Sequence, residues 1–369
     1  MNPFGKSILG KTGTLIRHSL VNQHRKEKSG QLLRITFNLS RTVIDSRETG
    51  QSQVASRLLL SALLLYSQRQ RYSTILLRVH MFSILGITGK VGGAVARSLL
   101  AAGQPVRAIV RSQEKGRVWA ERGCEVCVAD LDDQQSLIPA FQGSKSVFVM
   151  LPSNFDQADG FPETVSMVTS IRHALETARP QKVVCLSTIG AQATQSNLLS
   201  KLGIMERSLS VLPMSVIFLR AAWFMENAAR DIQAAMTTGT IASFLQPLDK
   251  PVPMVSTEDI GQVGAELLQC DDATLRVVEL EGPQRVTPAE IAAALSKLLA
   301  RPVCAEVVPR QTWAELFRSQ GASNPEPRMR MLDGFNEGWI EFDSDESAIR
   351  KGSITIDQAL TRLVQRISQ

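Results

Sequence analysis

The chain of 369 residues is long enough for one large domain or two medium ones, and its 44% of hydrophobic residues excludes disorder throughout. The net charge of +6 is unevenly spread, because residues 1–80 hold 13 Lys and Arg against 3 Asp and Glu. The rest of the chain is mildly acidic and has no basic stripe interleaved with aromatic residues. We therefore expect no nucleic-acid binding by the folded part.

Five cysteines are too few and too scattered for a disulfide framework, and their odd number is typical of a reducing compartment. Cys124 and Cys127 form a C-x-x-C pattern, but they lie in a strand-like run without a second pair or a nearby histidine. We expect buried structural thiols there, no metal site, and a cytoplasmic protein.

Residues 1–80 have the composition of a leader, since they are basic, acid-poor and rich in Ser, Thr and Gln. The leucine-rich run from Leu58 to Leu65 is shorter than the ~20 residues that cross a bilayer, so no membrane span is expected. Three interpretations are open: a start codon assigned too far upstream, a mitochondrial presequence, or a functional basic arm. In each case we expect the folded domain to begin at Met81.

Residues 81–92 combine a short apolar strand, glycines at every third position and the start of a helical pattern. A dinucleotide pyrophosphate needs this arrangement, because it must approach backbone N–H groups at the amino end of a helix without meeting a Cβ. An ordinary strand-to-helix turn is the alternative. The expected pyrophosphate contacts are Gly86, Thr88, Gly89, Lys90, Val91 and Gly92.

The next predicted strand, Val106–Val110, ends on Arg111 and Ser112. An Asp or Glu at this position would bind the ribose 2′-hydroxyl of NAD, whereas an arginine can pair with the 2′-phosphate of NADP. We therefore expect Arg111, with Ser112 and Lys115, to favour NADP(H) over NAD(H). An exposed arginine at a strand end, without a ligand, is the alternative.

Further apolar strands are predicted at 125–129, 147–150, 182–186 and 215–219, with helices between them, including one from Glu163 to Thr177. Alternating strands and helices predict an α/β fold with a doubly wound parallel sheet, which binds ligands at the carboxyl ends of its strands. Asp132 or Asp133 is expected to cap a helix that runs to Phe141. Additional cofactor contacts are expected from Asp130, Leu131, Leu151, Pro152, Ser187 and Thr188.

The carboxyl-terminal part mixes loops with capped helices. Thr287 to Glu290 has the pattern of a capping box with proline at the first helical position, so a helix is predicted as far as Leu299. Two more helices are predicted at 311–319 and 356–367. The segment from Asn324 to Phe342 has weak periodicity, and we expect a lid or pocket wall rather than a core element.

Five motifs together resemble the NmrA-like family of atypical short-chain dehydrogenase/reductases. They are Gly-Ile-Thr-Gly-Lys-Val-Gly at 86–92, Ile-Val-Arg-Ser at 109–112, Ala-Asp-Leu-Asp-Asp at 129–133, Leu-Ser-Thr-Ile-Gly-Ala at 186–191 and Leu-Arg-Ala-Ala-Trp-Phe-Met-Glu-Asn at 219–227. The last is the most specific, because the generic fold does not require it. One departure is Arg220-Ala221, where members often have Arg-Pro, and we expect a less rigid turn there.

The resemblance covers residues 81–369 and implies a Rossmann-like NAD(P) domain with a smaller carboxyl-terminal lobe over the substrate. Residues 81–220 would mainly hold the cofactor and residues 221–369 would mainly form the substrate lobe. Trp223, Phe224 and Asn227 are then expected in the substrate pocket.

The chain has no tyrosine after residue 80, so the usual Tyr-x-x-x-Lys mechanism of short-chain dehydrogenases is excluded. Lys201 is the best candidate for a proton donor or carbonyl polariser, with a solvated surface lysine as the alternative. Glu206 and His173 are interpreted as structural. Ser187, Thr188, Arg220 and Asn227 are the other polar groups near the strand ends.

Two functional hypotheses follow. The first is an NADPH-dependent reductase of a quinone or similar conjugated carbonyl, a small molecule that takes a hydride without a strong protein acid. The second is a non-catalytic sensor that binds the dinucleotide and reports its redox state to a protein partner, as some NmrA-like members do.

Overall fold

The computed structural model describes residues 80–272 and 276–367. The expectations about a leader and its leucine-rich run fall on residues outside this part of the chain. Met81 is the first residue of β1, and β1 pairs with a strand on each side. The expected first strand of the domain is therefore confirmed.

Eight parallel strands form the central sheet, in the order β12-β10-β6-β5-β4-β1-β2-β3. The strands are β1 Met81–Leu85, β2 Val106–Val110, β3 Glu125–Val128, β4 Ser144–Val149, β5 Lys182–Thr188, β6 Ser215–Ala221, β10 Val277–Glu281 and β12 Arg350–Lys351. The chain leaves β1 in one direction through β2 and β3, and returns on the other side through β4, β5 and β6. The predicted doubly wound α/β fold is confirmed, and its switch point lies between β1 and β4.

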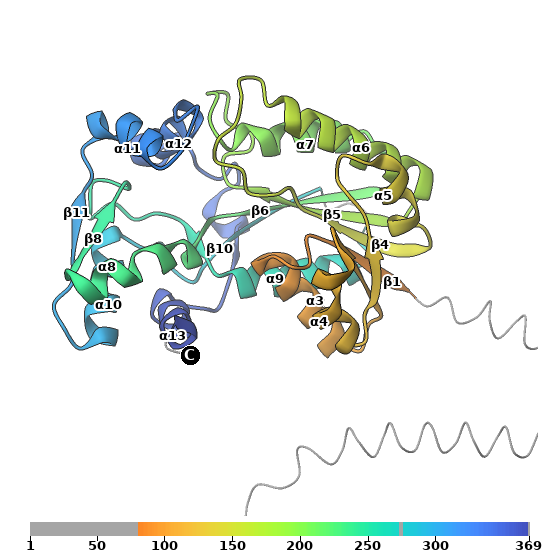
Figure 1. Ribbon diagram of the computed structural model, residues 1–369, viewed down its shortest axis with the longest axis horizontal. Coiled ribbons are helices and arrows are strands. Elements are labelled where there is room, and N and C mark those ends of the chain that lie inside the picture. The colour runs from red at the N-terminus through yellow and green to blue at the C-terminus, as the bar shows by residue number, and fades with distance from the viewer. Residues whose placement is uncertain (1–79, 273–275, 368–369) are drawn as a thin grey trace, which may run out of the picture. The chain divides into compact units, whose positions relative to one another are not determined.

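Helices cover both faces of this sheet, which explains why its strands are almost continuously apolar (Figure 1). One face carries α5 Gln134–Phe141, α6 Pro162–Ala178 and α7 Ser200–Leu209. The other face carries α3 Lys90–Ala101, α4 Gln113–Glu121 and α9 Thr257–Gln269. Asp133 caps α5 by accepting from the Gln135 backbone at 2.9 Å, as predicted for that helix.

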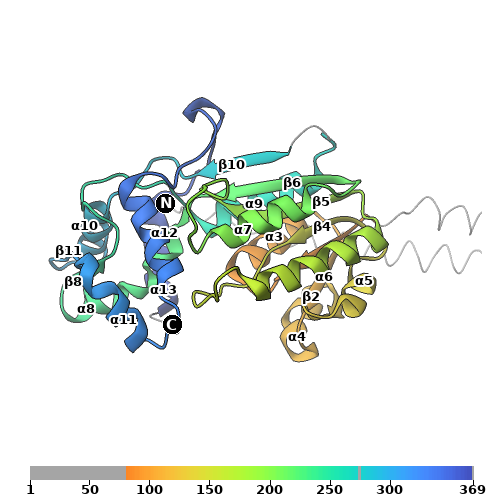
Figure 2. The same cartoon turned by 90° about the horizontal axis from the view of Figure 1, so that it is seen from above.

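The other elements of the carboxyl-terminal half gather at one end of the sheet (Figure 2). Strands β8 Thr240–Ser243 and β11 Cys304–Val307 pair in parallel, next to helices α8 Ile232–Thr237, α10 Pro288–Leu299, α11 Trp313–Ser319, α12 Glu326–Glu337 and α13 Ile356–Ile367. The predicted capping box of α10 is present, with both reciprocal bonds between Thr287 and Glu290.

The chain passes between the sheet and this lobe more than once. After residue 220 it forms the lobe's first elements, but α9 then packs against α3, and β10 and β12 extend the central sheet. The expected boundary at residue 220 falls inside β6, and the residues after it contribute both to the lobe and to the central sheet.

Two expectations about this half need correction: that residues 324–342 are not a core element, and that Ala221 lies in a turn. The segment from Asn324 to Phe342 contains α12, whose buried face adds Met329, Leu332 and Phe335 to the main hydrophobic core. Its pattern was hard to recognise because Pro, Gly, Asn and Arg interrupt the apolar positions. Ala221, expected in a turn, is the last residue of β6 and pairs with Thr188.

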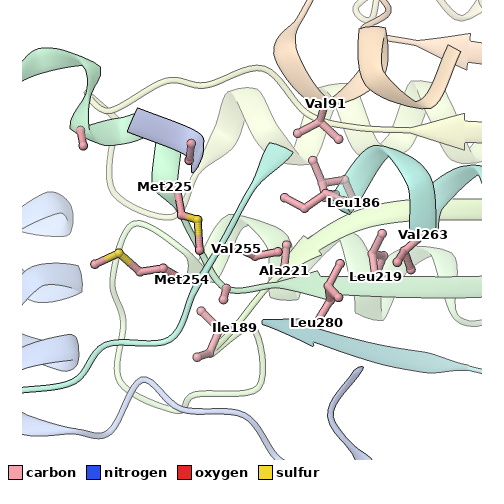
Figure 3. Packing of buried hydrophobic residues seen from close by; sticks show 14 of the residues in the cluster. Val91, Leu186, Ile189, Leu219, Ala221, Met225, Met254, Val255, Val263 and Leu280 are labelled. Carbon is pink, nitrogen blue, oxygen red and sulfur yellow. The ribbon is translucent and has the colours of Figure 1, made fainter. Parts of the chain in front are cut away.

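One continuous core joins the lobe to the sheet (Figure 3). Leu219 and Ala221 of β6 lie in this core with Met225 of the short 3-10 helix η1 (Met225–Arg230) and Met254 of β9 (Met254–Val255). Burial of each of the Leu and Met side chains contributes on the order of 1.5–3 kcal/mol. The strand ends are thus held firmly against the lobe that faces them.

Candidate functional site

The three glycines after β1 have three different structural roles. Gly86 has a φ of +76°, and a Cβ there would lie 2.6 Å from the Met150 side chain. A Cβ on Gly92 would lie 2.3 Å from the Gly86 carbonyl oxygen, so this glycine lets α3 pack closely against the turn. Gly89 is exposed, and the nearest atom to a Cβ would be the Gly86 oxygen at 3.3 Å.

This turn fits a dinucleotide. Gly89 is the N-cap residue of α3 and has no side chain to occupy the helix end, where unpaired N–H groups favour a phosphate. Thr88 and Lys90 are exposed beside it, and the Lys90 Nζ donates to the Glu226 carbonyl at 3.3 Å. The Val91 side chain is buried in the core, so only its backbone N–H could contact a ligand.

The expected ribose and adenine contacts lie at the carboxyl ends of β2 and β3. Arg111 is exposed, and no hydrogen bond or ion pair ties its guanidinium within residues 80–272 and 276–367. The Ser112 hydroxyl caps α4 by accepting from the Lys115 backbone at 3.5 Å. Asp130 is exposed, and one of its oxygens accepts from the Asp132 backbone at 3.2 Å.

A pocket of about 200 Å³ lies at the carboxyl ends of β4 and β5. The apolar residues that follow β4 form one side of the pocket. The first residues of α7 form a second side, and the residues directly after β6 form a third. The pocket brings together eight residues that were predicted for the nicotinamide and substrate end of the site: Leu151, Pro152, Ser187, Thr188, Lys201, Trp223, Phe224 and Asn227.

Lys201 lies in the first turn of α7 and is only 8% exposed. Its Nζ donates to the carbonyl oxygens of Pro152 and Asn154, at 3.4 and 3.3 Å. No carboxylate lies within ion-pair distance in the described residues, and burial lowers the pKa of the lysine to about 8. A surface lysine, the alternative interpretation, does not have these properties.

Glu206 and Arg220 form a buried polar network next to this pocket. The Glu206 carboxylate accepts two bonds from Arg220, at 3.0 and 2.7 Å, and a third from the Ser187 hydroxyl at 2.5 Å. Arg220 also pairs with Glu279 at 3.4 Å. Burial acts to lower the pKa of Arg220, but the two carboxylates outweigh it and hold that pKa above its ordinary value. Glu206 is structural, as predicted, and Arg220 is not free for catalysis.

Two side-chain interpretations need correction. His173 was interpreted as a satisfied structural histidine, but it is exposed on α6 and does not line the pocket. Helical position alone could not distinguish the buried face of α6 from its exposed face at that residue. Cys124 is buried as expected, whereas Cys127 is only half-buried, and burial raises the pKa of both thiols.

Several pocket residues could not be found from the sequence. Asn154 and Phe155 come from the loop after β4, and Met331 and Phe335 come from α12. The Phe335 ring packs edge-on against Trp223, with 5.2 Å between centroids. The available signal was the cluster of Met and Phe within residues 324–342, which suggested a pocket wall.

Neither a metal site nor a membrane span is found in the part of the chain that the structure describes. No cluster of three or more His, Cys, Asp or Glu side chains there could hold a metal ion. No helix in that part is long and apolar enough to cross a bilayer.

Comparison with known proteins finds two relatives that are named as reductases. An NAD(P)H azoreductase from Xenophilus azovorans is 30% identical over 225 residues, which cover 60% of this chain and 75% of the relative. A (4-alkanoyl-5-oxo-2,5-dihydrofuran-3-yl)methyl phosphate reductase from Streptomyces griseus is 26% identical, again over 60% of this chain and 75% of the relative.

Solved structures share the fold. An NADPH-dependent quinone oxidoreductase from Escherichia coli, complexed with NADPH, has a TM-score of 0.65 at 22% identity and covers 77% of this chain and 100% of its own. The triphenylmethane reductase of Citrobacter sp., complexed with NADP(H), has a TM-score of 0.64 at 21% identity and covers 76% of this chain and 99% of its own.

The family assignment rests on a match along most of the chain. Residues 80–342, which include all five motifs quoted above, match the NmrA-like family. The glycine turn, the parallel sheet and the lobe at its end have the arrangement that these motifs predict. This chain therefore belongs to the NmrA-like family.

Proposed function

We propose that this protein is an NAD(P)H-dependent reductase of a small conjugated acceptor, such as a quinone. The observation that carries the proposal is the position of Lys201. A buried lysine, with no carboxylate partner among the described residues, lies in an apolar pocket at the same edge of the sheet as the glycine turn. Buried titratable groups with shifted pKa values at strand ends are characteristic of functional sites.

The relatives support the reductase class. Both relatives are named as reductases, and the name of the first includes NAD(P)H. Neither name mentions a quinone as the molecule that is reduced. The quinone is our choice because its carbonyl accepts a hydride at a conjugated carbon without a strong protein acid.

The cofactor would be held by groups already described. The N–H groups at the start of α3 would bind the pyrophosphate, and Leu151 and Pro152 would pack on the nicotinamide ribose. We propose that Arg111 selects NADP(H), because its exposed guanidinium can donate two parallel hydrogen bonds to a 2′-phosphate. Bound NADPH would supply the hydride, and the protein supplies position and exclusion of water.

Lys201 would supply the proton. In the protonated form its Nζ has three donors, and two of them bond the carbonyls of Pro152 and Asn154. The third can bond the carbonyl oxygen of an acceptor in the pocket. As the acceptor carbon gains the hydride, this oxygen gains negative charge and takes the proton from Nζ, so the neutral amine remains.

The test is NADPH oxidation with a panel of quinones and azo compounds, together with the affinity for NADPH. Turnover that falls sharply in Lys201→Met, with NADPH affinity unchanged, is the expected result. Tight NADPH binding without turnover of any acceptor would contradict the proposal and would favour the redox sensor instead.

A further inference from the structure

A second chamber of about 310 Å³ adjoins the pocket that contains Lys201. Five side chains line both spaces: Phe155, Trp223, Phe224, Asn227 and Met331. The far part of the chamber is formed by η1, β8 and α12 of the carboxyl-terminal lobe. The two spaces are therefore adjacent, and Phe155 belongs to the wall that they share.

Two arginines face this chamber without a carboxylate partner at ion-pair distance. Within the described residues, Arg230 and Arg328 line it, and no ion pair or hydrogen bond ties either guanidinium. Their guanidinium carbons lie 5.3 and 5.5 Å from the centroid of the same Phe155 ring. Two like charges thus lie on one aromatic ring at the junction of the two spaces.

Arg328 is half-buried and is held by aromatic rings. Its guanidinium carbon lies 3.9 Å from the Phe317 ring centroid and 6.0 Å from that of Phe244. Such contacts stabilise a cation by about 0.5–2 kcal/mol, which only partly offsets the cost of burial. Burial, with the nearby charge of Arg230, lowers the pKa of Arg328.

Asp231 is the third charged residue among those that line the chamber. Burial raises its pKa to about 6, although Arg230 acts in the opposite direction. The chamber therefore has a net charge of +1 when Asp231 is ionised and +2 when it is protonated. An anionic group that enters would replace the missing counter-charge.

We propose that this chamber is a subsite for an anionic group on the acceptor, bound by Arg328 and Arg230. The inference rests on the proposed function and extends it to an acceptor class. The preferred acceptor is an elongated conjugated molecule whose reducible group lies beside Lys201 and whose carboxylate, sulfonate or phosphate lies in the second chamber. The planar forks of arginine match the oxygens of all three groups.

The kinetic test compares a naphthoquinone that carries a carboxyalkyl chain with its methyl ester. The wild-type protein is expected to prefer the acid in kcat/KM. Arg328→Gln should lower kcat/KM for the acid roughly 10- to 100-fold, the range for a hydrogen bond to a charged group, and leave the ester unchanged. Arg328→Lys should restore part of the preference because it keeps the charge.

The matched control is Arg318→Gln, which removes the same charge from an exposed position on α11 that does not line the chamber. It should leave both acceptors unchanged. NADPH affinity should be unchanged in all variants, because the chamber is not the cofactor site. Equal losses for acid and ester in Arg328→Gln would mean a purely structural arginine, and an unselective wild-type protein would also overturn the subsite.

A binding measurement separates this inference from the reductase proposal. Naphthoate and its methyl ester accept no hydride, and both can be titrated calorimetrically into the full-length protein with NADPH. Tighter binding of naphthoate that is lost in Arg328→Gln supports the subsite even if no acceptor is turned over. Equal binding of the two compounds overturns it even if quinones are reduced.

Discussion

Arg220 donates two hydrogen bonds to the carboxylate of Glu206 and thereby ties β6 to α7 beside the pocket. The same carboxylate accepts from the Ser187 hydroxyl of β5, so β6 and the two elements β5 and α7, which bear pocket residues, meet at one ion pair. Since α7 also carries Lys201, this pair helps to fix where the lysine lies. We interpret the network as support for the site rather than as part of its chemistry.

Arg220→Met should therefore lower the free energy of unfolding by about 3–5 kcal/mol, because it leaves Glu206 and Glu279 buried without their cation. Urea unfolding measures the change. The control is Arg172→Met, which breaks a partly exposed pair with Glu176 within α6 and should cost less than about 0.5 kcal/mol. Similar losses for both variants would show that the Arg220 network is unimportant.

Substitution of two glycines of the turn should affect stability and cofactor affinity separately. Gly92→Ala should destabilise the fold, because its Cβ would lie 2.3 Å from the Gly86 carbonyl oxygen. Gly89→Val should leave most of the stability and weaken NADPH and NADH alike, because its side chain would occupy the space at the end of α3 that a pyrophosphate needs. Thermal melts and cofactor titrations measure the two effects. Unchanged cofactor affinity in Gly89→Val would contradict the assignment of the glycine turn as the pyrophosphate-binding site.

Arg111→Ala tests cofactor choice. We expect it to weaken NADPH by about 1.5–3 kcal/mol and to leave NADH almost unchanged, since only NADPH carries the 2′-phosphate. Fluorescence titration of both cofactors measures the difference. The exposed Arg117 on α4 provides a control as Arg117→Ala, which should affect neither cofactor. Equal weakening of NADPH and NADH by Arg111→Ala would contradict the preference.

The sequence was sufficient where a short local pattern determines the structure. The glycine spacing predicted the turn after β1, and the alternation of apolar strands with helices predicted the parallel sheet. Lys201 could be proposed because the chain resembles a family in which some reductases keep a lysine at the start of this helix.

The second chamber could not be predicted in this way. Phe155, Arg230 and Arg328 come from three elements far apart in the sequence, and only the packing of the lobe brings them together. Arg328 lies in a helix whose apolar pattern is interrupted. The sequence therefore indicated neither this helix nor the direction in which the Arg328 side chain points. Burial of a single arginine depends on tertiary contacts that no local spacing encodes.

The affinity of the second chamber for an anion should depend on pH through Asp231. Because burial raises the pKa of this carboxyl to about 6, it is ionised at pH 7.5 and repels a bound anion, whereas at pH 5.5 it is largely protonated. The other charged lining residues are Arg230 and Arg328. Naphthoate should bind more tightly at pH 5.5, and Asp231→Asn should remove the pH dependence. Calorimetry measures the naphthoate affinity at the two pH values. If the affinity of Asp231→Asn changes with pH as much as that of the wild-type protein, Asp231 is excluded as the cause.

Lys201 gives the last prediction, because its stability effect and its catalytic effect have opposite signs. Burial lowers the pKa of this lysine to about 8, so the folded protein favours the neutral amine more than the unfolded chain does. At pH 7 the charged form therefore costs up to about 3 kcal/mol of stability, and this cost disappears as the pH rises through 8 toward the unfolded pKa near 10. Lys201→Met should thus raise the melting temperature at pH 7.

The same substitution should lower turnover, since a proton donor must be charged. In the wild-type protein kcat/KM for a quinone should fall as the pH rises through about 8, and Lys201→Met should remove this limb of the pH profile along with most of the activity. Lys297→Met, which changes an exposed lysine of α10, should keep both the activity and the limb. A wild-type profile that is flat up to pH 10 would show that Lys201 is not the proton donor.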